Sequence, residues 1–288
     1  MTVLVLGGGG QVANAVVAAA GPQHEVLVRS RAQLDICDAA ALAAALTQSR
    51  AHWVINAAAY TAVDLAEDHA AQATAINDTA VGSLAMAAAA VGCRLLHLST
   101  DFVFDGRSNR AYLPADQTAP LSVYGRSKLG GERHVLQCAG AGIVLRTAWV
   151  YASAGRNFAL TMLRLMREKE RLSVVSDQIG TPTWAHGIAL AIWGLIDAGA
   201  PGGVYHWTDL GVASWYDFAV AIQDEALARG LLSRAVPISP IPSTDYPTRA
   251  LRPAFSVLNT ESTRALIGVP ARHWRHNLRT MLDELRTA

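Results

Sequence analysis

The stretch that decides the fold lies at the start of the chain and reads Val3-Leu4-Val5-Leu6-Gly7-Gly8-Gly9-Gly10-Gln11-Val12-Ala13. Its apolar run predicts a buried strand, the glycines predict a tight turn, and the residues from Gln11 to Ala20 predict a helix. Glycines at such a junction let the backbone approach a pyrophosphate, which the free N–H groups of the helix N-terminus favour. This position between strand and helix favours a dinucleotide-binding loop over a ligand-free flexible turn. Ala13 replaces the third glycine of the usual spacing, and an alanine still permits close helix–strand packing.

Short apolar runs and alanine-rich helical runs alternate through the first half of the chain. This pattern is typical of a parallel sheet covered by helices on both faces. We therefore predict an α/β protein with a Rossmann-like doubly wound parallel sheet and a smaller C-terminal substrate-binding lobe. Further strands are predicted at 26–28, 53–55, 94–98 and 143–145, and helices at 39–49, 70–91 (one helix or two joined ones) and 122–138.

The pattern loosens after Trp149. A helix is predicted at 157–169, a strand at 172–175 and a helix at 185–198, and the proline- and serine-rich segment from Pro237 to Pro253 is predicted to be a loop. Loops at the carboxyl end of a parallel sheet usually form the substrate pocket. We expect a dinucleotide-binding domain at 1–155, with a return at about 183–205, and a mainly substrate-binding lobe at 156–288.

Composition restricts the class of protein. The 288 residues are 51% hydrophobic with a formal net charge of +1, which permits a large core and gives no electrostatic reason to expect nucleic acid or an anionic membrane as partner. Cys37, Cys93 and Cys138 are too few and too scattered for a disulfide framework. The first twenty residues lack the positively charged start of a signal peptide, and residues 79–93 are too short to span a bilayer. We expect a soluble, cytoplasmic protein.

The residues after the second strand bear on cofactor choice. NAD-specific sites usually place a carboxylate there, whereas this chain has Arg29, Ser30 and Arg31, with no carboxylate before Asp35. Two cations and a hydroxyl suit a 2′-phosphate, so NADPH is the expected cofactor, and NADH stays open as a second one. Ordinary solvated surface arginines are nearly as good an interpretation of the same residues. Leu34, Asp35 and Ile36 are candidates for the adenine side.

Tyr124 and Lys128 lie four residues apart on a predicted helix, so their side chains share one face. A neighbouring ammonium is expected to lower the pKa of a tyrosine toward neutrality, and Lys128 is also placed to hold the nicotinamide ribose. Thr100, after the fourth strand, is placed to polarise a substrate carbonyl. A Tyr-x-x-x-Lys pair alone is a frequent coincidence, but its order after the glycine loop and Thr100 predicts a catalytic group.

Six further segments make the sequence resemble the dTDP-4-dehydrorhamnose reductases, a family of extended short-chain dehydrogenase/reductases, over residues 3 to about 285. These segments are residues 56–64 (NAAAYTAVD), 99–106 (STDFVFDG), 120–128 (PLSVYGRSK), 145–151 (LRTAWVY) with Asn157-Phe158, 177–183 (DQIGTPT) and Arg252-Pro253. The resemblance implies NAD(P)H-dependent reduction of the C4 ketone of dTDP-4-dehydro-L-rhamnose to dTDP-L-rhamnose. Phe102 and Phe255 depart from the commonest family pattern and bear on substrate fit.

The resemblance also implies a role for each matching position. Tyr124 would be the proton donor, with Lys128 and Thr100 assisting. Cofactor contacts would come from Gly7, Gly10, Gln11, Val12, Arg29, Asp35, Ile36, Ala57, Ala58, Ala59, Tyr60, Tyr124 and Lys128. Substrate contacts would come from Val63, Thr100, Asp101, Trp149, Asn157 and Arg252, the last meeting the diphosphate.

Some of these residues also have a purely structural interpretation. Asp64 would equally well cap the helix that follows it, Trp149 would fill the core, and His97 is expected to be a buried histidine and not a ligand. Aligning the motifs places Ala15 and His186 where some relatives have magnesium-linked glutamates. Both are poor magnesium ligands, so no metal site and a monomer or weak homodimer are expected.

Other functions on the same fold remain as alternatives. A 4,6-dehydratase needs an Asp-Glu pair after the threonine, whereas this chain has Asp101-Phe102. Another nucleotide-sugar reductase, an epimerase and a non-catalytic regulatory subunit resembling methionine adenosyltransferase beta are not distinguished by motifs. The joint presence of Thr100, Tyr124 and Lys128 favours an enzyme.

Overall fold

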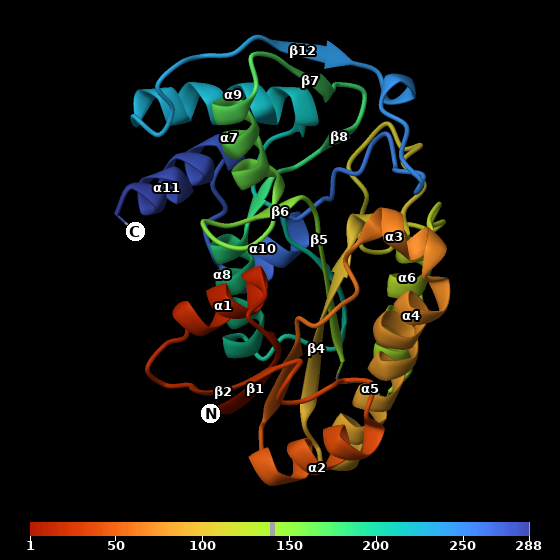
Figure 1. Ribbon diagram of the computed structural model, residues 1–288. Helices are drawn as coiled ribbons and strands as arrows, with labels where there is room; N and C mark the ends of the chain where they lie inside the picture. The colour runs from red at the N-terminus through yellow and green to blue at the C-terminus, as the bar shows by residue number, and fades with distance from the viewer. Residues whose placement is uncertain (139–141, 288) are drawn as a thin grey trace.

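The computed structural model describes residues 1–138 and 142–287, and its largest sheet has six strands in the order β10-β5-β4-β3-β1-β2 (Figure 1). Every neighbouring pair in this sheet is parallel. Since β2 lies on one side of β1 and β3 on the other, the strand order reverses at β1, where open α/β sheets bind ligands. The strands are β1 (Thr2–Gly8), β2 (Glu25–Ser30), β3 (Trp53–Asn56), β4 (Arg94–Thr100), β5 (Ile143–Thr147) and β10 (Gly203–His206).

Alternate residues of β1 enter the two cores that lie on opposite faces of this sheet. Val3 and Val5 pack in one core with α1 (Gln11–Ala18) and α8 (Ala185–Asp197). Leu4 and Leu6 pack in the other with α2 (Ala39–Ser49), α5 (Ala80–Ala90) and α6 (Val123–Gln137). The predicted doubly wound α/β fold is confirmed.

The helix predicted at 70–91 is two α-helices joined by a π-helical turn. α4 (Ala70–Thr74) leads into η1 (Ala75–Thr79) and then α5, and α3 (Val63–Asp68) precedes them. π-helical turns are rare and frequently lie at functional sites. Here the turn packs against α6, the helix that bears Tyr124 and Lys128.

The remaining helices and short strands form a second lobe with its own core, drawn at the top of Figure 1. Its core is built mainly on α7 (Phe158–Glu168), α9 (Trp215–Ala228) and α11 (Trp274–Thr287), and α10 (Glu261–Ile267) instead contacts α8 and β10. The described residues also form three two-stranded sheets: β6 (Val150–Tyr151) with β9 (Thr183–Trp184), β11 (Ala213–Ser214) with β8 (Ile179–Gly180), and β12 (Ile238–Ile241) with β7 (Leu172–Val175).

The prediction of a loop from Pro237 to Pro253 is wrong for part of that segment. β12 pairs in parallel with β7, and a short 3-10 helix, η3 (Ser243–Asp245), follows it. Pro240 is tolerated because β12 lies at the edge of a two-stranded sheet and has one pairing side free.

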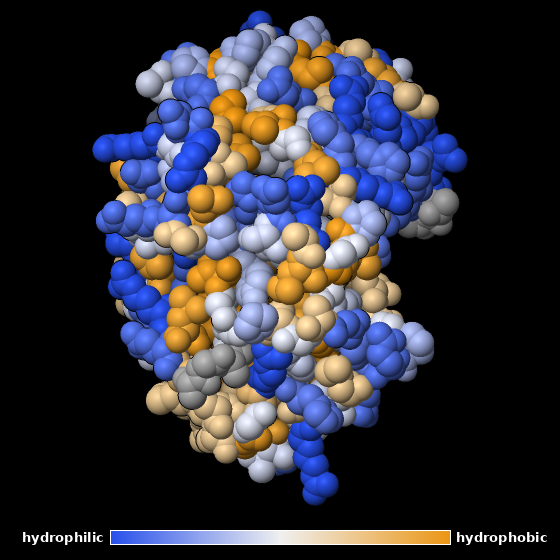
Figure 2. All heavy atoms as spheres, turned by 180° about the vertical axis from the view of Figure 1, so that it is seen from behind, coloured by the Kyte–Doolittle hydropathy of each residue, from blue (hydrophilic) through white to orange (hydrophobic). Residues whose placement is uncertain are grey.

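The surface that faces away in Figure 1 has hydrophilic and hydrophobic residues interspersed, as Figure 2 shows. The exposed large hydrophobic side chains come from many different elements, among them Val17 of α1, Leu65 of α3 and Leu190 of α8. Among the described residues, none of the helices combines the length and the apolar character that crossing a bilayer requires.

Candidate active site

A cavity of about 900 Å³ opens at the carboxyl ends of β1, β3, β4 and β5. Elements from both lobes line it, including the glycine loop, the start of α6 and the start of α9. The lining residues are Gly7, Gly8, Gly9, Gly10, Gln11, Val12, Arg31, Leu34, Asp35, Ile36, Ala57, Ala58, Ala59, Thr61, Val63, Ile76, Leu98, Ser99, Thr100, Asp101, Phe102, Tyr124, Lys128, Thr147, Ala148, Trp149, Val150, Gly155, Arg156, Phe158, Trp215 and Arg252.

The glycine loop forms one wall of this cavity. Gly7 and Gly9 both have a φ of 91°, which an L side chain rarely adopts. A Cβ on Gly7 would lie 2.7 Å from the backbone of Ala57, whereas a Cβ on Gly9 would meet nothing within 4 Å. Gly10 begins α1 without a side-chain cap, so the first N–H groups of α1 are free for a ligand. The loop therefore has the shape and the donors that an anion requires.

The two arginines after β2 are placed differently. Arg31 lines the cavity, whereas the Nη1 of Arg29 donates to the carbonyl of Val28 at 2.9 Å and Arg29 is outside the lining set. Asp35 also lines the cavity, and its Oδ1 accepts a hydrogen bond from the backbone of Cys37 at 3.0 Å. Of these two arginines, Arg31 is thus the one whose side chain lies at the cavity.

The segment after β3 lies beside the glycine loop and is held by the π-helical turn. Ala57, Ala58 and Ala59 line the cavity. Tyr60 does not, and its backbone N–H donates to Asn77 Oδ1 at 2.8 Å. The Asn77 amide group also donates to the Tyr60 carbonyl and to Ser127 Oγ, each at 3.0 Å. One buried asparagine in η1 therefore fixes this segment against α6.

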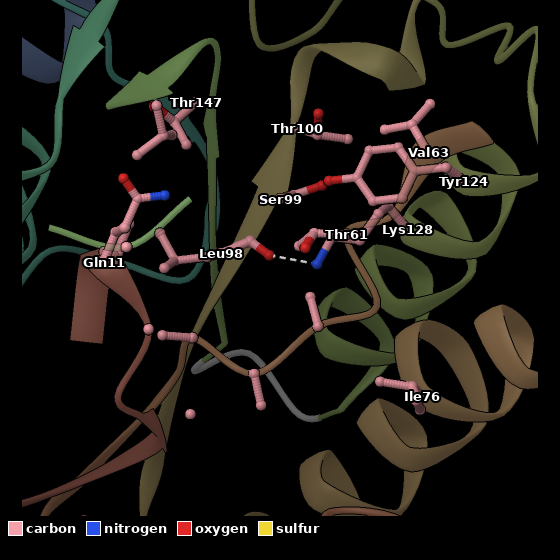
Figure 3. A pocket seen from close by; sticks show the side chains of 18 of the residues that line it. Gln11, Thr61, Val63, Ile76, Leu98, Ser99, Thr100, Tyr124, Lys128 and Thr147 are labelled. Atoms are coloured by element: carbon pink, nitrogen blue, oxygen red, sulfur yellow. Dashed lines mark hydrogen bonds between the residues drawn. The ribbon is translucent and has the colours of Figure 1, made fainter. Parts of the chain in front are cut away.

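Tyr124 and Lys128 point from α6 toward the end of β4, where Ser99 and Thr100 lie (Figure 3). The helix begins at Ser122, whose Oγ accepts from the backbone of Gly125 at 3.1 Å. A Cβ at residue 125 would collide with the Phe102 carbonyl, so glycine permits this close approach. The three predicted catalytic residues are brought together.

Burial controls the proton affinity of the groups in this wall. Burial raises the pKa of Tyr124 to about 12. A hydrogen bond with Thr100 lowers this pKa, and the negative charge of Asp101 raises it further. Burial also raises the pKa of Asp101 to about 6, against hydrogen bonds from Ser256 and Thr100. The expectation of a lowered tyrosine pKa is therefore wrong for this structure, because loss of solvent dominates. A tyrosine with a raised pKa keeps its proton and can donate it.

Two stacked indoles form another wall of the cavity. Trp149 has a φ of 48° and stacks on Trp215 with ring centroids 3.5 Å apart and planes 1° apart. Trp215 Nε1 donates to Gln178 Oε1 at 3.2 Å, which fixes its ring. Trp149 is thus a pocket wall, not a core filler.

Asn157 and Arg252 contact the site in ways the sequence did not predict. Asn157 is the N-cap of α7, and its Nδ2 donates to Gln11 Oε1 at 2.9 Å, which joins the two lobes beside the glycine loop. Asn157 itself does not line the cavity. Arg252 lines the cavity and forms an ion pair with Asp64, which lies in the first turn of α3; the N-cap of that helix is Ala62.

Several lining residues were not predicted. Trp215 and Arg156 are the most informative, because an indole and a guanidinium both recognise ligands. The start of α9 is visible in the sequence as a capping box between Ser214 and Asp217. The capping box predicts where α9 begins, but it does not predict that this end of the helix lies at the cavity. In the described ranges, no group of three or more His, Cys, Asp or Glu side chains is arranged to hold a metal.

Known proteins resemble this chain over its whole length. A family model described as "RmlD substrate binding domain" matches residues 1–287. The dTDP-4-dehydrorhamnose reductase of Burkholderia thailandensis is 40% identical over 96% of both chains, and that of Mycobacterium tuberculosis is 41% identical over 97% of this chain and 91% of its own. A crystal structure of dTDP-4-dehydrorhamnose reductase from Bacillus anthracis in complex with NADP has a TM-score of 0.93 and 31% identity, covering 98% of this chain and 99% of that one.

Proposed function

Since the chain belongs to the dTDP-4-dehydrorhamnose reductase family, we propose that it reduces the C4 ketone of dTDP-4-dehydro-L-rhamnose to dTDP-L-rhamnose with NADPH as the preferred cofactor. The observation that carries the proposal is the convergence of Thr100, Tyr124 and Lys128 in a cavity that also contains the glycine loop. The protein is accordingly an NAD(P)H-dependent oxidoreductase.

The cavity fits a dinucleotide. The open space at Gly9 and the uncapped start of α1 suit a pyrophosphate, and Arg31 suits a 2′-phosphate. Thr147 lines the same cavity, and its Oγ1 is buried without a hydrogen-bond partner in the described part of the chain. A buried hydroxyl of this kind favours a polar ligand group beside it. NADPH supplies the hydride when it is bound.

The residues of this chain supply the proton and the orientation. Tyr124 donates its phenolic proton to the oxygen that develops on C4, and its raised pKa keeps that proton in place beforehand. Thr100, whose hydroxyl donates to Asp101 at 3.0 Å, holds the tyrosine and the substrate oxygen in register. The stacked Trp149 and Trp215 bound the sugar side, and Arg252 meets the diphosphate.

We also propose a division of labour between lobes. Residues 1–155, with the return at about 183–205, hold the cofactor, and residues 156–288 mainly hold the substrate. Support comes from β10, which joins the six-stranded sheet, and from α8, which packs on α1. The oligomeric state that we propose is a monomer or weak homodimer.

An activity assay with the purified chain tests the proposal. Absorbance at 340 nm should fall when dTDP-4-dehydro-L-rhamnose is added with NADPH, and one dTDP-L-rhamnose should form for each NADPH consumed. An epimerase would convert the sugar with no net loss of NADPH, and a regulatory subunit would bind without converting it. Binding of the keto sugar with no NADPH oxidation would contradict the proposal.

A further inference from the structure

A loop of the second lobe is anchored to the first residue of the helix that follows the glycine loop. That residue is Gln11, which begins α1 and is labelled in Figure 3. Its Nε2 donates to the backbone carbonyl of Arg156 at 3.2 Å, and its Oε1 accepts from Asn157 Nδ2 at 2.9 Å. Both ends of one side-chain amide therefore bind the two residues that directly precede α7.

The residues before α7 explain how this loop comes so close to α1. Gly155 has a φ of 81°, which an L side chain rarely adopts, and a Cβ there would lie 3.1 Å from Gln11 Cγ. Asn157 caps α7 by accepting from the backbone of Leu160 at 3.0 Å, and its Nδ2 also donates to the Ala152 carbonyl at 2.9 Å. The loop is thus closed by its own hydrogen bond and held against Gln11.

The anchored loop bears one charged group without a protein partner. Arg156 is an exposed residue of the cavity lining, and its guanidinium has no hydrogen bond or ion pair with the residues that the structure describes. Two other cations of the lining are engaged, because Arg252 pairs with Asp64 and Lys128 donates to the Leu98 carbonyl. A guanidinium with its donors free is suited to a phosphate ligand.

The charges of the cavity lining favour an anionic ligand. The cationic side chains of the lining are Arg31, Lys128, Arg156 and Arg252, and its carboxylates are Asp35 and Asp101. The uncapped N–H groups at the start of α1 add positive character beside Gln11, to which the Arg156 carbonyl is bonded. Donors from both lobes are therefore connected through one glutamine.

We propose that Arg156 binds the pyrophosphate of the dinucleotide, so that both lobes hold the cofactor. The glycine loop and α1 contact the pyrophosphate from the first lobe when the cofactor is bound, and Arg156 contacts it from the second. This assignment of Arg156 rests on the cofactor of the proposed function and not on its sugar substrate. Because NADPH and NADH share the pyrophosphate, the contact adds affinity for both and no preference between them.

The diphosphate of the nucleotide sugar is the other anion that belongs in this cavity. The two arginines are anchored to different elements, Arg252 to α3 through Asp64 and Arg156 to α1 through Gln11. Since α1 directly follows the glycine loop, the cofactor diphosphate is the one within reach of Arg156, and Arg252 is left for the substrate.

Equilibrium binding measures this contact without turnover. Arg156→Ala should raise the Kd for NADPH and the Kd for NADH by about tenfold each, as expected for one lost charge-assisted contact, and leave their ratio unchanged. Fluorescence of the reduced nicotinamide reports both. Arg171→Ala is the matched control and should keep the parental values, because Arg171 is an exposed arginine of the same lobe outside the cavity lining. Arg156→Lys, which keeps the charge and loses the planar fork, should give intermediate values.

Three further ligands separate the pyrophosphate from the other phosphates. ADP-ribose contains the pyrophosphate without a 2′-phosphate, 2′-AMP contains the 2′-phosphate without the pyrophosphate, and dTDP contains the diphosphate of the substrate. Calorimetry with Arg156→Ala should show weaker binding of ADP-ribose alone. Unchanged binding of NADPH and NADH, or a loss for 2′-AMP or dTDP as large as that for ADP-ribose, would overturn the proposal.

Asn157→Ser tests whether the anchor positions Arg156. Serine is a good N-cap, so α7 keeps its start, but the shorter side chain loses its contact with Gln11. The Kd for NADPH should rise, and adding Arg156→Ala should then raise it by much less than the tenfold expected in the parent. A full tenfold effect of Arg156→Ala in the Asn157→Ser background would contradict an anchored arginine.

None of these binding measurements requires the keto sugar. A chain that binds NADPH through Arg156 and never reduces the sugar would lose the proposed function and keep this contact. An active reductase whose Arg156→Ala variant binds both cofactors as the parent does would lose this contact and keep the proposed function.

Discussion

Arg252 and Asp64 lie 188 positions apart in the chain and form a two-pronged ion pair at the edge of the cavity. Nη1 and Nη2 of Arg252 lie 3.1 and 2.8 Å from Oδ1 and Oδ2 of Asp64, and Asp64 Oδ1 also accepts from the backbone of Ala250. Hydrogen bonds from Arg252 and Ala250 outweigh burial and lower the pKa of Asp64. The arginine proposed to meet the diphosphate is therefore held in place by a carboxylate.

Arg252→Ala should raise the KM for the nucleotide sugar by about tenfold or more and leave kcat within a small factor, because a charge-assisted contact to a diphosphate is lost. Steady-state kinetics with NADPH saturating will measure both constants. Asp64→Asn is the matched control: it keeps the shape, weakens the ion pair and retains the arginine, so KM should rise less than in Arg252→Ala. An equal rise of KM in both variants would show that Arg252 acts only by tethering its loop to α3.

Tyr124→Phe should lower kcat at least ~10²-fold, the lower range for loss of a general acid, while the Kd for NADPH stays nearly unchanged. Fluorescence titration with NADPH will give the Kd, and the 340 nm assay will give the rate. Tyr205→Phe serves as control, because its hydroxyl donates to the Pro201 carbonyl at 2.8 Å, away from the cavity lining. Near-parental turnover in Tyr124→Phe would exclude the tyrosine as proton donor.

Arg31→Ala should reduce the preference for NADPH over NADH by about tenfold, whereas Arg29→Ala should change it little. Of these two arginines only Arg31 lines the cavity, and the Arg29 guanidinium donates to the carbonyl of Val28 in its own strand. One charge-assisted contact of roughly 1.5–3 kcal/mol corresponds to a factor of about ten or more. The measurement is kcat/KM with each cofactor. Loss of the preference in Arg29→Ala alone would reverse the assignment, and no loss in either would show that neither arginine binds the 2′-phosphate.

Asp209 should make the protein less stable as the pH rises. Burial raises its pKa to about 7, against hydrogen bonds from Asn277 and the Trp184 backbone. A carboxyl group with a raised pKa stabilises the fold fully below its unfolded pKa of about 4, and that stability is lost as the pH rises through 7. Urea unfolding at pH 5 and pH 8 will measure the difference.

Asp209→Asn should shrink that difference, because an amide does not ionise. Other groups titrate over the same range, so the comparison is between parent and variant and not between the two pH values alone. Asp283→Asn, an exposed carboxylate paired with Arg229, provides the control and should leave the pH dependence nearly as it is in the parent. Identical pH dependence in parent and Asp209→Asn would mean that Asp209 is ionised throughout.

The first half of the fold is predictable from the sequence because its signals are local. The Val3–Leu6 strand, the glycines after it and the alanine-rich helices each depend on their own residues. The strand at Gly203–His206 was missed, because its four residues are neither a long apolar run nor an alternating one, and its pairing with β5 provides what the segment lacks. The strand at Ile238–Ile241 was missed because it contains a serine and a proline, and both residue types are typical of loops.

The site was predictable where a motif lies on one element and not where two lobes meet. Tyr124 and Lys128 share a helix face, so their spacing was enough to bring them together. Trp215 lies at the cavity because of how α9 packs, and Arg252 lies beside Asp64 because of the course of a long connection. Neither the packing of α9 nor the course of that connection produces a periodic pattern in the sequence. The raised pKa of Tyr124 depends on burial, which four-residue spacing does not report.

The return of α8 and β10 to the sheet means that no single break in the backbone separates the two lobes. A chain cut after β5 would leave the sheet without its edge strand, and a chain cut after β10 would leave the second lobe without α9 and α11. Each lobe therefore depends on segments from both halves of the chain. Exchanging the substrate side between relatives would require several grafted segments, whereas a recombination event with one crossover would leave hybrids that cannot complete either core.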